Sequence, residues 1–342
     1  MATLYAATNH TSTTMATDQP TTLLCLASYE KGKTLIEEAK ERGARVLFVT
    51  PEKLRDADWP HDHIDEIYYT PDGSSREDLI HSVSYLARSA SIDRIIPLDE
   101  FDLNAAAALR EHLRIPGMGQ TTVRHFRDKL AMRIEAQEAG IRVPDFVSTI
   151  NYDAIRAFMD RCAPPWILKP RSEASAVGLK KIYEAETLWR TLDELGDRQS
   201  YFLLEEFIPG SVYHVDALVN DNSVAFAEAH GYLNPPFEVM HDGGIFASRT
   251  LDRASDEALM CQSLNEQLIE SLGMVRGAVH TEFIRGADDG QFYFLETAAR
   301  VGGANIADMV DRVEALLGEY MHRFREDFHA SMSVPDSIED EG

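Results

Sequence analysis

Two glutamates near the end of the chain lie inside apolar runs, where a strand would ordinarily bury an apolar side chain. Glu282 belongs to the first run of the segment Val279–Gly303 and Glu296 to the second, and the turn-forming residues Gly286–Gly290 separate the two runs. Two apolar runs around such a turn predict a β-hairpin. The hairpin would bring the two carboxylates into one region.

The register expected for this hairpin places both glutamates on one face. We take Arg285 as the partner of Gln291. Glu282 then lies opposite Phe294, with Glu296 as its diagonal neighbour on the same face. Two adjacent carboxylates repel unless a cation lies between them, and Mg²⁺ accepts such ligands while leaving positions for phosphates. Glu282 and Glu296 are therefore candidate metal ligands; the alternative is a hairpin edge with two solvated glutamates.

Two basic residues have positions that suit anion binding. Arg300 follows Glu296 by four residues, and a guanidinium can hold phosphate or stabilise a developing anion. Asp128 can cap a helix that begins at Lys129. A helix N-terminus attracts anions, and a lysine in that turn opposes the helix dipole, which suggests that an anion compensates it. The alternative for Lys129 is a solvated surface lysine.

A third basic residue, Lys169, ends an apolar strand and precedes a loop of small residues. The strand is Trp166–Leu168, the loop is Ser172–Val177, which includes Ser175, and a return strand follows from Gly178. Backbone N–H groups of such a loop can hold phosphates while a lysine reaches them from the strand. A surface hairpin with a charged end is the alternative.

A further segment has the chemistry to hold a purine ring. Tyr201–Pro209 is predicted to be a strand that runs into a turn at Gly210. An adenine ring needs an apolar slot with one backbone donor and one backbone acceptor at its edge. The residues Glu205, Glu206 and Ile208 belong to a linker that can offer both.

The composition excludes several other classes of protein. The chain has 342 residues, 44% of them apolar, and a net charge of −24 from 57 acidic and 33 basic residues. Proteins that bind duplexes need basic patches, so we expect no nucleic-acid partner. No stretch of about 18 apolar residues occurs, so we expect no membrane span. The cysteines Cys25, Cys162 and Cys261 show no CxxC spacing, which is typical of a reducing compartment, and we expect the cytoplasm.

The domain organisation follows from the pattern of apolar runs. Residues 1–20, rich in Thr and Ser, and the acidic residues 331–342 are expected to be disordered. Strands then alternate with helices, which predicts a parallel, doubly wound sheet and a Rossmann-like domain over residues 21–115. Two phosphate-loop lookalikes fail, because Ala27 replaces the first glycine of a P-loop and Thr122 the last glycine of a dinucleotide fingerprint.

The remainder is expected to form a small lobe over residues 116–200 and a large lobe over residues 201–330. Gly231–Thr250 has many aromatic residues, glycines and prolines but little regular pattern, which favours a lid or a substrate wall. Helices are predicted over Gly117 to about Val147, Leu259–Leu272 and about Ile306–Phe328.

Taken together, the motifs resemble the ATP-grasp superfamily of carboxylate–amine and carboxylate–thiol ligases, in an order that covers about Thr21–Ala330. The ending E-T-A-A-R-V-G-G is most similar to the branch of L-amino-acid ligases and related dipeptide-forming enzymes. The resemblance implies phosphate binding by Lys129, Lys169 and Ser175, adenine binding by Glu205, Glu206 and Ile208, metal binding by Glu282 and Glu296, and catalysis by Arg300.

Two departures from the family pattern concern the metal and the ribose. Ala298 stands where many members have a metal-binding Asn, and Asn305 or water would complete a second metal. Val212 stands where many members have an acidic ribose contact, and Asp216 or His214 would serve instead. Candidate substrate contacts are Arg249, His241, His280 and Asn305.

The resemblance also implies an architecture and a reaction. An α/β first domain would precede a two-lobed ATP-grasp domain of α+β character. With ATP and Mg²⁺, or Mn²⁺, the protein would phosphorylate a small carboxylate, in this branch an amino acid. An amine would then attack the acylphosphate to give an amide, ADP and phosphate. The expected partners are the small-molecule carboxylate and amine, and a second copy in a homodimer. The alternatives are a different nucleophile, namely a thiol, a carrier-protein amine or a carboxylation partner, and an ATP-binding protein with reduced catalysis.

Overall fold

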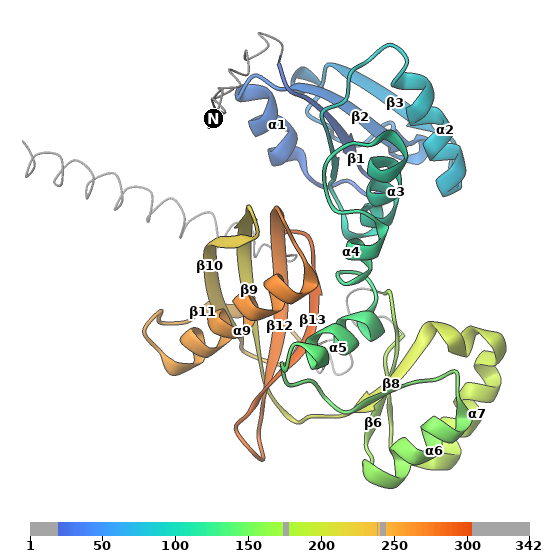
Figure 1. The fold of residues 1–342 in the computed structure, drawn as a ribbon, viewed down its shortest axis with the longest axis vertical. Coiled ribbons are helices and arrows are strands. Elements are labelled where there is room, and N and C mark those ends of the chain that lie inside the picture. Colours follow the sequence, from blue (N-terminus) through green and yellow to red (C-terminus); the bar gives the residue numbers. More distant parts are fainter. Residues whose placement is uncertain (1–19, 174–177, 238, 240–243, 303–342) are drawn as a thin grey trace, which may run out of the picture. The chain divides into compact units, whose positions relative to one another are not determined.

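The structure is a computed structural model that describes residues 20–173, 178–237, 239 and 244–302 of the chain. The chain divides into two compact units, residues 1–96 and 97–342, whose elements are labelled in Figure 1. The predicted leader apart from residue 20, the helix expected over residues 306–328 and the acidic tail lie outside the described residues. The domain boundaries at residues 115 and 200 stay predictions. No helix of the described segments is long and apolar enough to cross a membrane.

A four-stranded sheet in the order β3-β2-β1-β4 forms the first unit. Its elements are β1 (Thr22–Leu26), α1 (Lys33–Glu41), β2 (Arg45–Pro51), the 3₁₀ helices η1 (Glu52–Leu54) and η2 (His61–His63), β3 (Glu66–Thr70), α2 (Arg76–Leu86) and β4 (Arg94–Pro97). β2 pairs in parallel with both β1 and β3, and Leu24, Val46 and Phe48 are fully buried. Continuous apolar strands suit a parallel sheet, so the predicted Rossmann-like sheet is confirmed.

The second unit begins with helices: η3 (Glu100–Asp102), α3 (Leu103–Leu113), α4 (Gln120–Arg124) and α5 (Lys129–Glu138). The prediction of one helical stretch from Gly117 to about Val147 is wrong. The Asp128 carboxylate caps α5 by accepting a hydrogen bond from the backbone N–H of Leu130 at 3.0 Å, as expected. Gly140, with a φ of 77°, ends the helix in the left-handed conformation that favours glycine.

A four-stranded antiparallel sheet, in the order β5-β8-β6-β7, follows. Its elements are β5 (Phe146–Ser148), α6 (Tyr152–Arg161), β6 (Trp166–Pro170), β7 (Lys180–Ile182), α7 (Ala185–Leu195), the 3₁₀ helix η4 (Gly196–Tyr201) and β8 (Phe202–Glu206). Phe158 of α6 and Leu188 of α7 share one core with Trp166 and Leu204. The strand and return strand around Lys169 are confirmed, whereas the sequence analysis missed α6 and α7.

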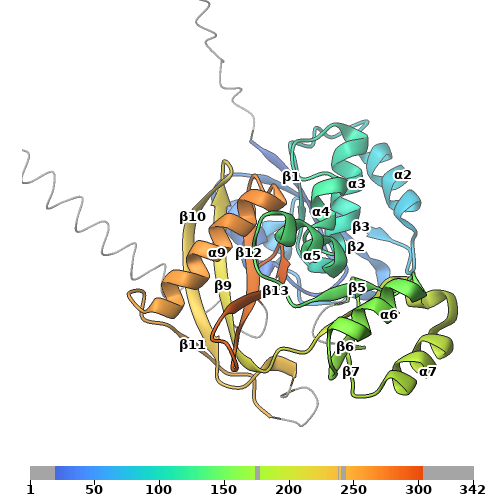
Figure 2. The same ribbon diagram turned by 60° about the horizontal axis from the view of Figure 1, so that its bottom comes forward.

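A five-stranded antiparallel sheet, in the order β11-β10-β9-β12-β13, completes the second unit. Its elements are β9 (Gly210–Asn220), β10 (Ser223–Tyr232), β11 (Ser248–Thr250), α9 (Asp256–Leu272), β12 (Gly277–Gly286) and β13 (Phe292–Ala298). Met132 of α5 and Leu268 of α9 pack with Phe283 and Phe294 in one core, so both helices cover the same face of this sheet (Figure 2). The predicted hairpin and the amphipathic helix before it are confirmed.

The contact between Gly210 and β12 gives a test of this arrangement. Gly210 pairs with Gly286, and a Cβ on Gly210 would lie 2.1 Å from the backbone oxygen of Arg285. We expect Gly210→Ala to lower the free energy of unfolding by about 1–3 kcal/mol, the usual cost of overpacking, when urea unfolding is measured. Ser211→Ala, at the exposed next position, is the control. Equal stability of the two variants would contradict the close approach.

Candidate active site

The hairpin β12–β13 places the two candidate metal ligands directly opposite each other. Glu282 pairs with Glu296, whereas Arg285 pairs with Phe292. The predicted register, with Arg285 opposite Gln291, is therefore wrong. The reason is that Gln291 closes the turn, since its carbonyl oxygen accepts a hydrogen bond from the N–H of Gly286 at 2.8 Å.

A bulge in the hairpin explains how both glutamates share a face despite this shift. Phe283 pairs with Phe294, and the register changes between this pair and the pair of glutamates, so Leu295 is the extra residue. Phe283 and Phe294 are fully buried in the core. Leu295 and Glu296 both line a cavity on the opposite face, because the bulge locally changes the direction of the side chains.

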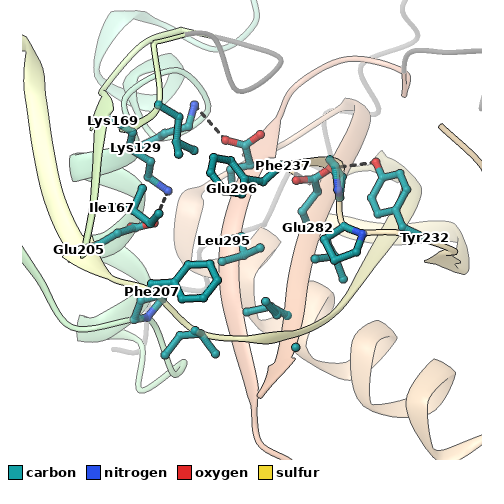
Figure 3. A pocket seen from close by; sticks show the side chains of 18 of the residues that line it. Lys129, Ile167, Lys169, Glu205, Phe207, Tyr232, Phe237, Glu282, Leu295 and Glu296 are labelled. Atoms are coloured by element: carbon teal, nitrogen blue, oxygen red, sulfur yellow. Dashed lines mark hydrogen bonds and ion pairs between the residues drawn. The ribbon is translucent and has the colours of Figure 1, made fainter. Parts of the chain in front are cut away.

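That cavity has a volume of about 560 Å³ and is lined by residues of both antiparallel sheets (Figure 3). Its apolar side chains include Ile167, Phe207, Ile208, Val212, Ile284 and Leu295. Its charged side chains include Lys129, Lys169, Glu205, Glu282, Glu296 and Arg300. An apolar slot beside a charged region suits a ligand that joins a flat ring to anionic groups.

Lys129 reaches this cavity from the first turn of α5. Its Nζ lies 2.9 Å from Glu296 Oε2 and donates a hydrogen bond to the backbone oxygen of Glu173 at 2.6 Å. Burial opposes the ionisation of Glu296, but the positive charges of Lys129 and Lys169 hold the pKa of that carboxyl well below its usual range. The side chain of Lys129 is only 12% exposed, so it is not a solvated surface lysine.

Lys169 is held by a carboxylate that itself lies between two cations. Its Nζ is 2.5 Å from Glu205 Oε1, while Arg133 of α5 donates to Glu205 Oε2 from Nε at 3.2 Å and Nη2 at 3.0 Å. Burial raises the pKa of Glu205, but Arg133 and Lys169 outweigh it and the pKa is lowered. Burial lowers the pKa of Lys169 to about 8, against the opposing effect of Glu205.

Arg133 was missed by the sequence analysis. Its side chain is fully buried, and it lies on the core-facing side of α5 beside Met132 and Ala136. A charged residue on the apolar face of a predicted amphipathic helix was the available indication. Its partner, Glu205, lies 72 residues away in sequence, and no local pattern connects the two.

Glu282 accepts two contacts at one oxygen. The Tyr232 hydroxyl donates to Glu282 Oε1 at 2.9 Å, and His280 Nε2 lies 3.5 Å from the same atom. Burial alone would lower the pKa of His280, but Asp216 and Glu282 raise it to about 10, so the imidazole is a cation at neutral pH. In the sequence, Tyr232 belongs to the segment Gly231–Thr250, and no pattern there identified it as a partner of Glu282.

Arg300 is anchored by an acidic residue that precedes α3. Its Nε donates to Glu100 Oε2 at 2.9 Å, and the other oxygen of Glu100 pairs with Arg127. Glu100 is buried, and the sequence analysis did not single it out. The pair fixes the guanidinium of Arg300 where it lines the cavity.

The remaining predicted residues divide into three groups. Glu206 and Ile208 line the cavity, as does His280. Asp216 is buried behind the cavity lining, and Arg249 lies exposed on β11, so neither lines the cavity. Ser175, His241 and Asn305 lie outside the described residues.

The chemistry of the two glutamates fits a hard divalent cation. Within the described part of the chain, neither Glu282 Oε2 nor Glu296 Oε1 has a hydrogen-bond partner, whereas the other oxygen of each is engaged. Two carboxylates that each leave one oxygen toward a cavity suit Mg²⁺ or Mn²⁺, which prefer oxygen ligands. Glu282 and Glu296 are therefore the residues that would hold such an ion.

Part of the chain matches a known domain family. Residues 162–308 match the ATP-grasp domain family. The predicted resemblance to that superfamily is thereby confirmed.

Its relatives among curated proteins include amino-acid ligases. The chain is 25% identical over 255 residues to the L-arginine-specific L-amino acid ligase of Bacillus subtilis, a match that covers 72% of this chain and 61% of that protein. It is 23% identical over 309 residues to the alanine–anticapsin ligase of Bacillus subtilis strain 168, covering 82% of this chain and 64% of that protein. The chain therefore spans about three fifths of the length of these relatives.

Solved structures show the same fold. The L-amino acid ligase from Bacillus licheniformis superposes with a TM-score of 0.67 at 22% identity, covering 85% of this chain and 69% of that one. The N5-carboxyaminoimidazole synthetase from Staphylococcus aureus, complexed with ADP, superposes with a TM-score of 0.64 at 19% identity, covering 83% and 72%. The predicted combination of a parallel sheet and a two-lobed ATP-grasp domain is thereby confirmed.

The buried charges around Lys169 generate a prediction about stability. Glu205→Gln would leave Lys169 and Arg133 buried without a counter-charge, so we expect a loss of about 3–5 kcal/mol in the free energy of unfolding. Arg133→Met would leave the ion pair of Lys169 and Glu205, whose charges compensate each other, and we expect a smaller loss in the free energy of unfolding. Urea unfolding measures both.

A matched control for this prediction is Asp153→Asn, which removes an exposed ion pair with Arg156. Exposed pairs contribute little, so stability should hardly change. A Glu205→Gln variant as stable as Asp153→Asn would contradict the account of the three buried charges.

Proposed function

We propose that the protein is an ATP-dependent carboxylate–amine ligase. It would phosphorylate the carboxylate of an amino acid and join the acylphosphate to an amine, forming an amide or peptide bond and releasing ADP and phosphate. The observation that carries the proposal is that Lys129, Lys169, Glu282, Glu296 and Arg300 all line one cavity. The names of the relatives, which form bonds to amino acids, support the same reaction class.

The apolar part of the cavity suits the adenine ring. Phe207, Ile208 and Leu295 line it, and the linker at Ile208 connects the two antiparallel sheets. The N–H groups of Glu206 and Phe207 donate to Asp145 and Pro165. In the described segments the N–H of Ile208 has no acceptor, which leaves it available to the edge of a purine.

The charged part of the cavity suits the triphosphate. Lys129 and Lys169 enter it from α5 and β6 and would hold phosphate oxygens, with Glu296 and Glu205 fixing their positions until the nucleotide binds. When bound between Glu282 and Glu296, Mg²⁺ or Mn²⁺ would neutralise charge on the phosphates during transfer.

Arg300 has the position and the rigidity to stabilise the acyl group during both steps. Its guanidinium is held by Glu100, so it would donate hydrogen bonds to the acylphosphate and to the oxyanion that forms when the amine attacks, without reorganising first. Loss of one such donor typically costs about 3–4 kcal/mol, or roughly a thousandfold in rate.

The aromatic wall of the cavity is the candidate contact for the amino-acid substrate. Tyr232, Phe237 and Phe246 line it beside Ser248 and His280. The three aromatic residues and Ser248 come from the segment that was predicted to be a lid or a substrate wall, and their contact with the cavity supports the second of these roles.

The reaction is tested by measuring the release of ADP and phosphate from ATP and Mg²⁺ with pooled amino acids, then with pairs. We expect release to need a carboxylate and an amine together and to fall at least a thousandfold in Glu296→Ala, because the metal site is lost. Turnover that needs a thiol or a carrier protein in place of the amine would mean that the nucleophile differs from the one proposed. No binding of ATP would refute it.

The pKa of Lys169 generates a prediction about pH. Because this pKa is about 8, the lysine is charged below pH 8 and loses its proton as the pH rises further. Metal-free ATP affinity, measured by calorimetry, should therefore fall between about pH 8 and pH 9.5. Lys169→Met should bind ATP more weakly at pH 7 and lose this part of the pH dependence. An unchanged profile in Lys169→Met would show that another group titrates.

A further inference from the structure

Three buried polar residues lie beside Glu282 on the same face of the sheet. His214 and Asp216 are on β9 and His280 is on β12, where His280 pairs with Asp216 and Glu282 pairs with His214. The exposed fractions are 0%, 4% and 7% in that order. Each oxygen of Asp216 is engaged, since Oδ2 lies 2.7 Å from His214 Nδ1 and Oδ1 lies 2.9 Å from His280 Nδ1.

Polar contacts continue from these residues in both directions. His214 Nε2 lies 2.6 Å from the hydroxyl of Ser248, which lines the cavity at the start of β11. His280 Nε2 faces Glu282 Oε1 at 3.5 Å, and the Tyr232 hydroxyl donates to the same oxygen at 2.9 Å. One connected set of contacts thus includes residues of β9, β10, β11 and β12 and meets at a single oxygen of Glu282.

His280 lies opposite the position where a metal ligand was expected and none is present. His280 pairs with Ala298 across β12 and β13, two positions from the pair of glutamates. Ala298 is the residue that stands where an asparagine ligand was expected, and its methyl group offers no ligand atom. Among the described residues the candidate metal ligands of the hairpin are Glu282 and Glu296, so the orientation of Glu282 has a direct influence on metal affinity.

We propose that Tyr232 and His280 are positioning residues that hold Glu282 by Oε1 and so present Oε2 to the metal ion, with Asp216 and His214 fixing the ring of His280. The inference rests on the proposed function for the metal site and adds residues to it. Groups that orient a metal ligand typically change metal affinity by 10–100-fold when they are removed.

A transition-metal site made by the same three buried residues is the competing interpretation. Their ligand atoms all lie within 4.8 Å of one another. However, both oxygens of Asp216 are at hydrogen-bond distance from ring nitrogens. Tetrahedral zinc with bonds of about 2.0–2.1 Å would hold its ligand atoms roughly 3.3 Å apart. Both nitrogens of His280 also face carboxylate oxygens, toward which each would direct an N–H, so neither offers a lone pair to a metal.

The test uses Tyr232→Phe in the full chain, because this change removes one hydroxyl and keeps the ring. Binding of Mn²⁺ in the presence of a non-hydrolysable ATP analogue is measured by electron paramagnetic resonance of the free ion. We expect the affinity for Mn²⁺ to fall about tenfold or more, while metal-free binding of the analogue stays unchanged. The rate of ADP release that Tyr232→Phe loses at low Mg²⁺ should be recovered at high Mg²⁺. A structural defect would not be corrected by more Mg²⁺.

Tyr293→Phe is the matched control, because it removes a similar hydrogen bond, from the Tyr293 hydroxyl to Asp289 at 2.8 Å, outside the cavity lining. It should bind Mn²⁺ like the unchanged protein. Asp216→Asn, which keeps the shape of the side chain, should weaken Mn²⁺ binding in the same direction as Tyr232→Phe.

Three outcomes would overturn the inference. Unchanged Mn²⁺ affinity in Tyr232→Phe, alongside loss of binding in Glu296→Ala, would refute the positioning role and leave the proposed function intact. Absence of metal-dependent nucleotide binding in the unchanged protein would refute both. Stoichiometric zinc in the purified protein, lost in Asp216→Asn, would establish the competing metal site.

Discussion

Two carboxylates face each other across the strand pair β12–β13 and repel each other. The surrounding side chains are arranged so that they compensate this repulsion. Glu296 is paired with Lys129, and Glu282 with the Tyr232 hydroxyl and His280. Each glutamate therefore uses one oxygen for a partner from its own protein and keeps the other toward the cavity. This arrangement holds two negative charges close together without a bound ion, and it leaves a defined place for one.

Helix α5 connects this pair of glutamates to the rest of the second unit. Lys129 in its first turn contacts Glu296, Arg133 one turn later binds Glu205, and Met132 packs in the core beneath the large sheet. Asp128, which caps the helix, also pairs with Arg171 at the end of β6. The start of one short helix thus fixes both lysines of the cavity relative to the hairpin.

The sequence was sufficient for the parts of the site that local patterns determine. Apolar runs separated by turns predicted the hairpin, and a capping aspartate before an amphipathic run predicted the start of α5 at Lys129. The register of the hairpin could not be predicted in this way, because Gln291 closes the turn and the bulge at Leu295 shifts the pairing. Neither feature is visible in the alternation of apolar residues that predicted the hairpin.

Residues that act through distant partners were also beyond the sequence. Glu100 and Arg300 are 200 residues apart, and Arg133 and Glu205 are 72 apart. Tyr232 and Glu282 meet only because β10 and β12 belong to one sheet. The helices α6 and α7 were also not predicted, although their buried faces, with Ile155 and Phe158 in α6 and Leu188 and Leu192 in α7, follow a local helical pattern.

The three buried charges Lys169, Glu205 and Arg133 also limit which combinations of substitutions this part of the chain can accept. A carboxylate enclosed by two cations tolerates neither its own neutralisation nor the loss of both partners, because either change leaves a buried charge without a partner. The effects of substitutions at these positions are therefore not additive, although the residues belong to β6, β8 and α5. Replacing all three with apolar side chains of similar volume would remove the constraint, and it would also remove the lysine from the cavity.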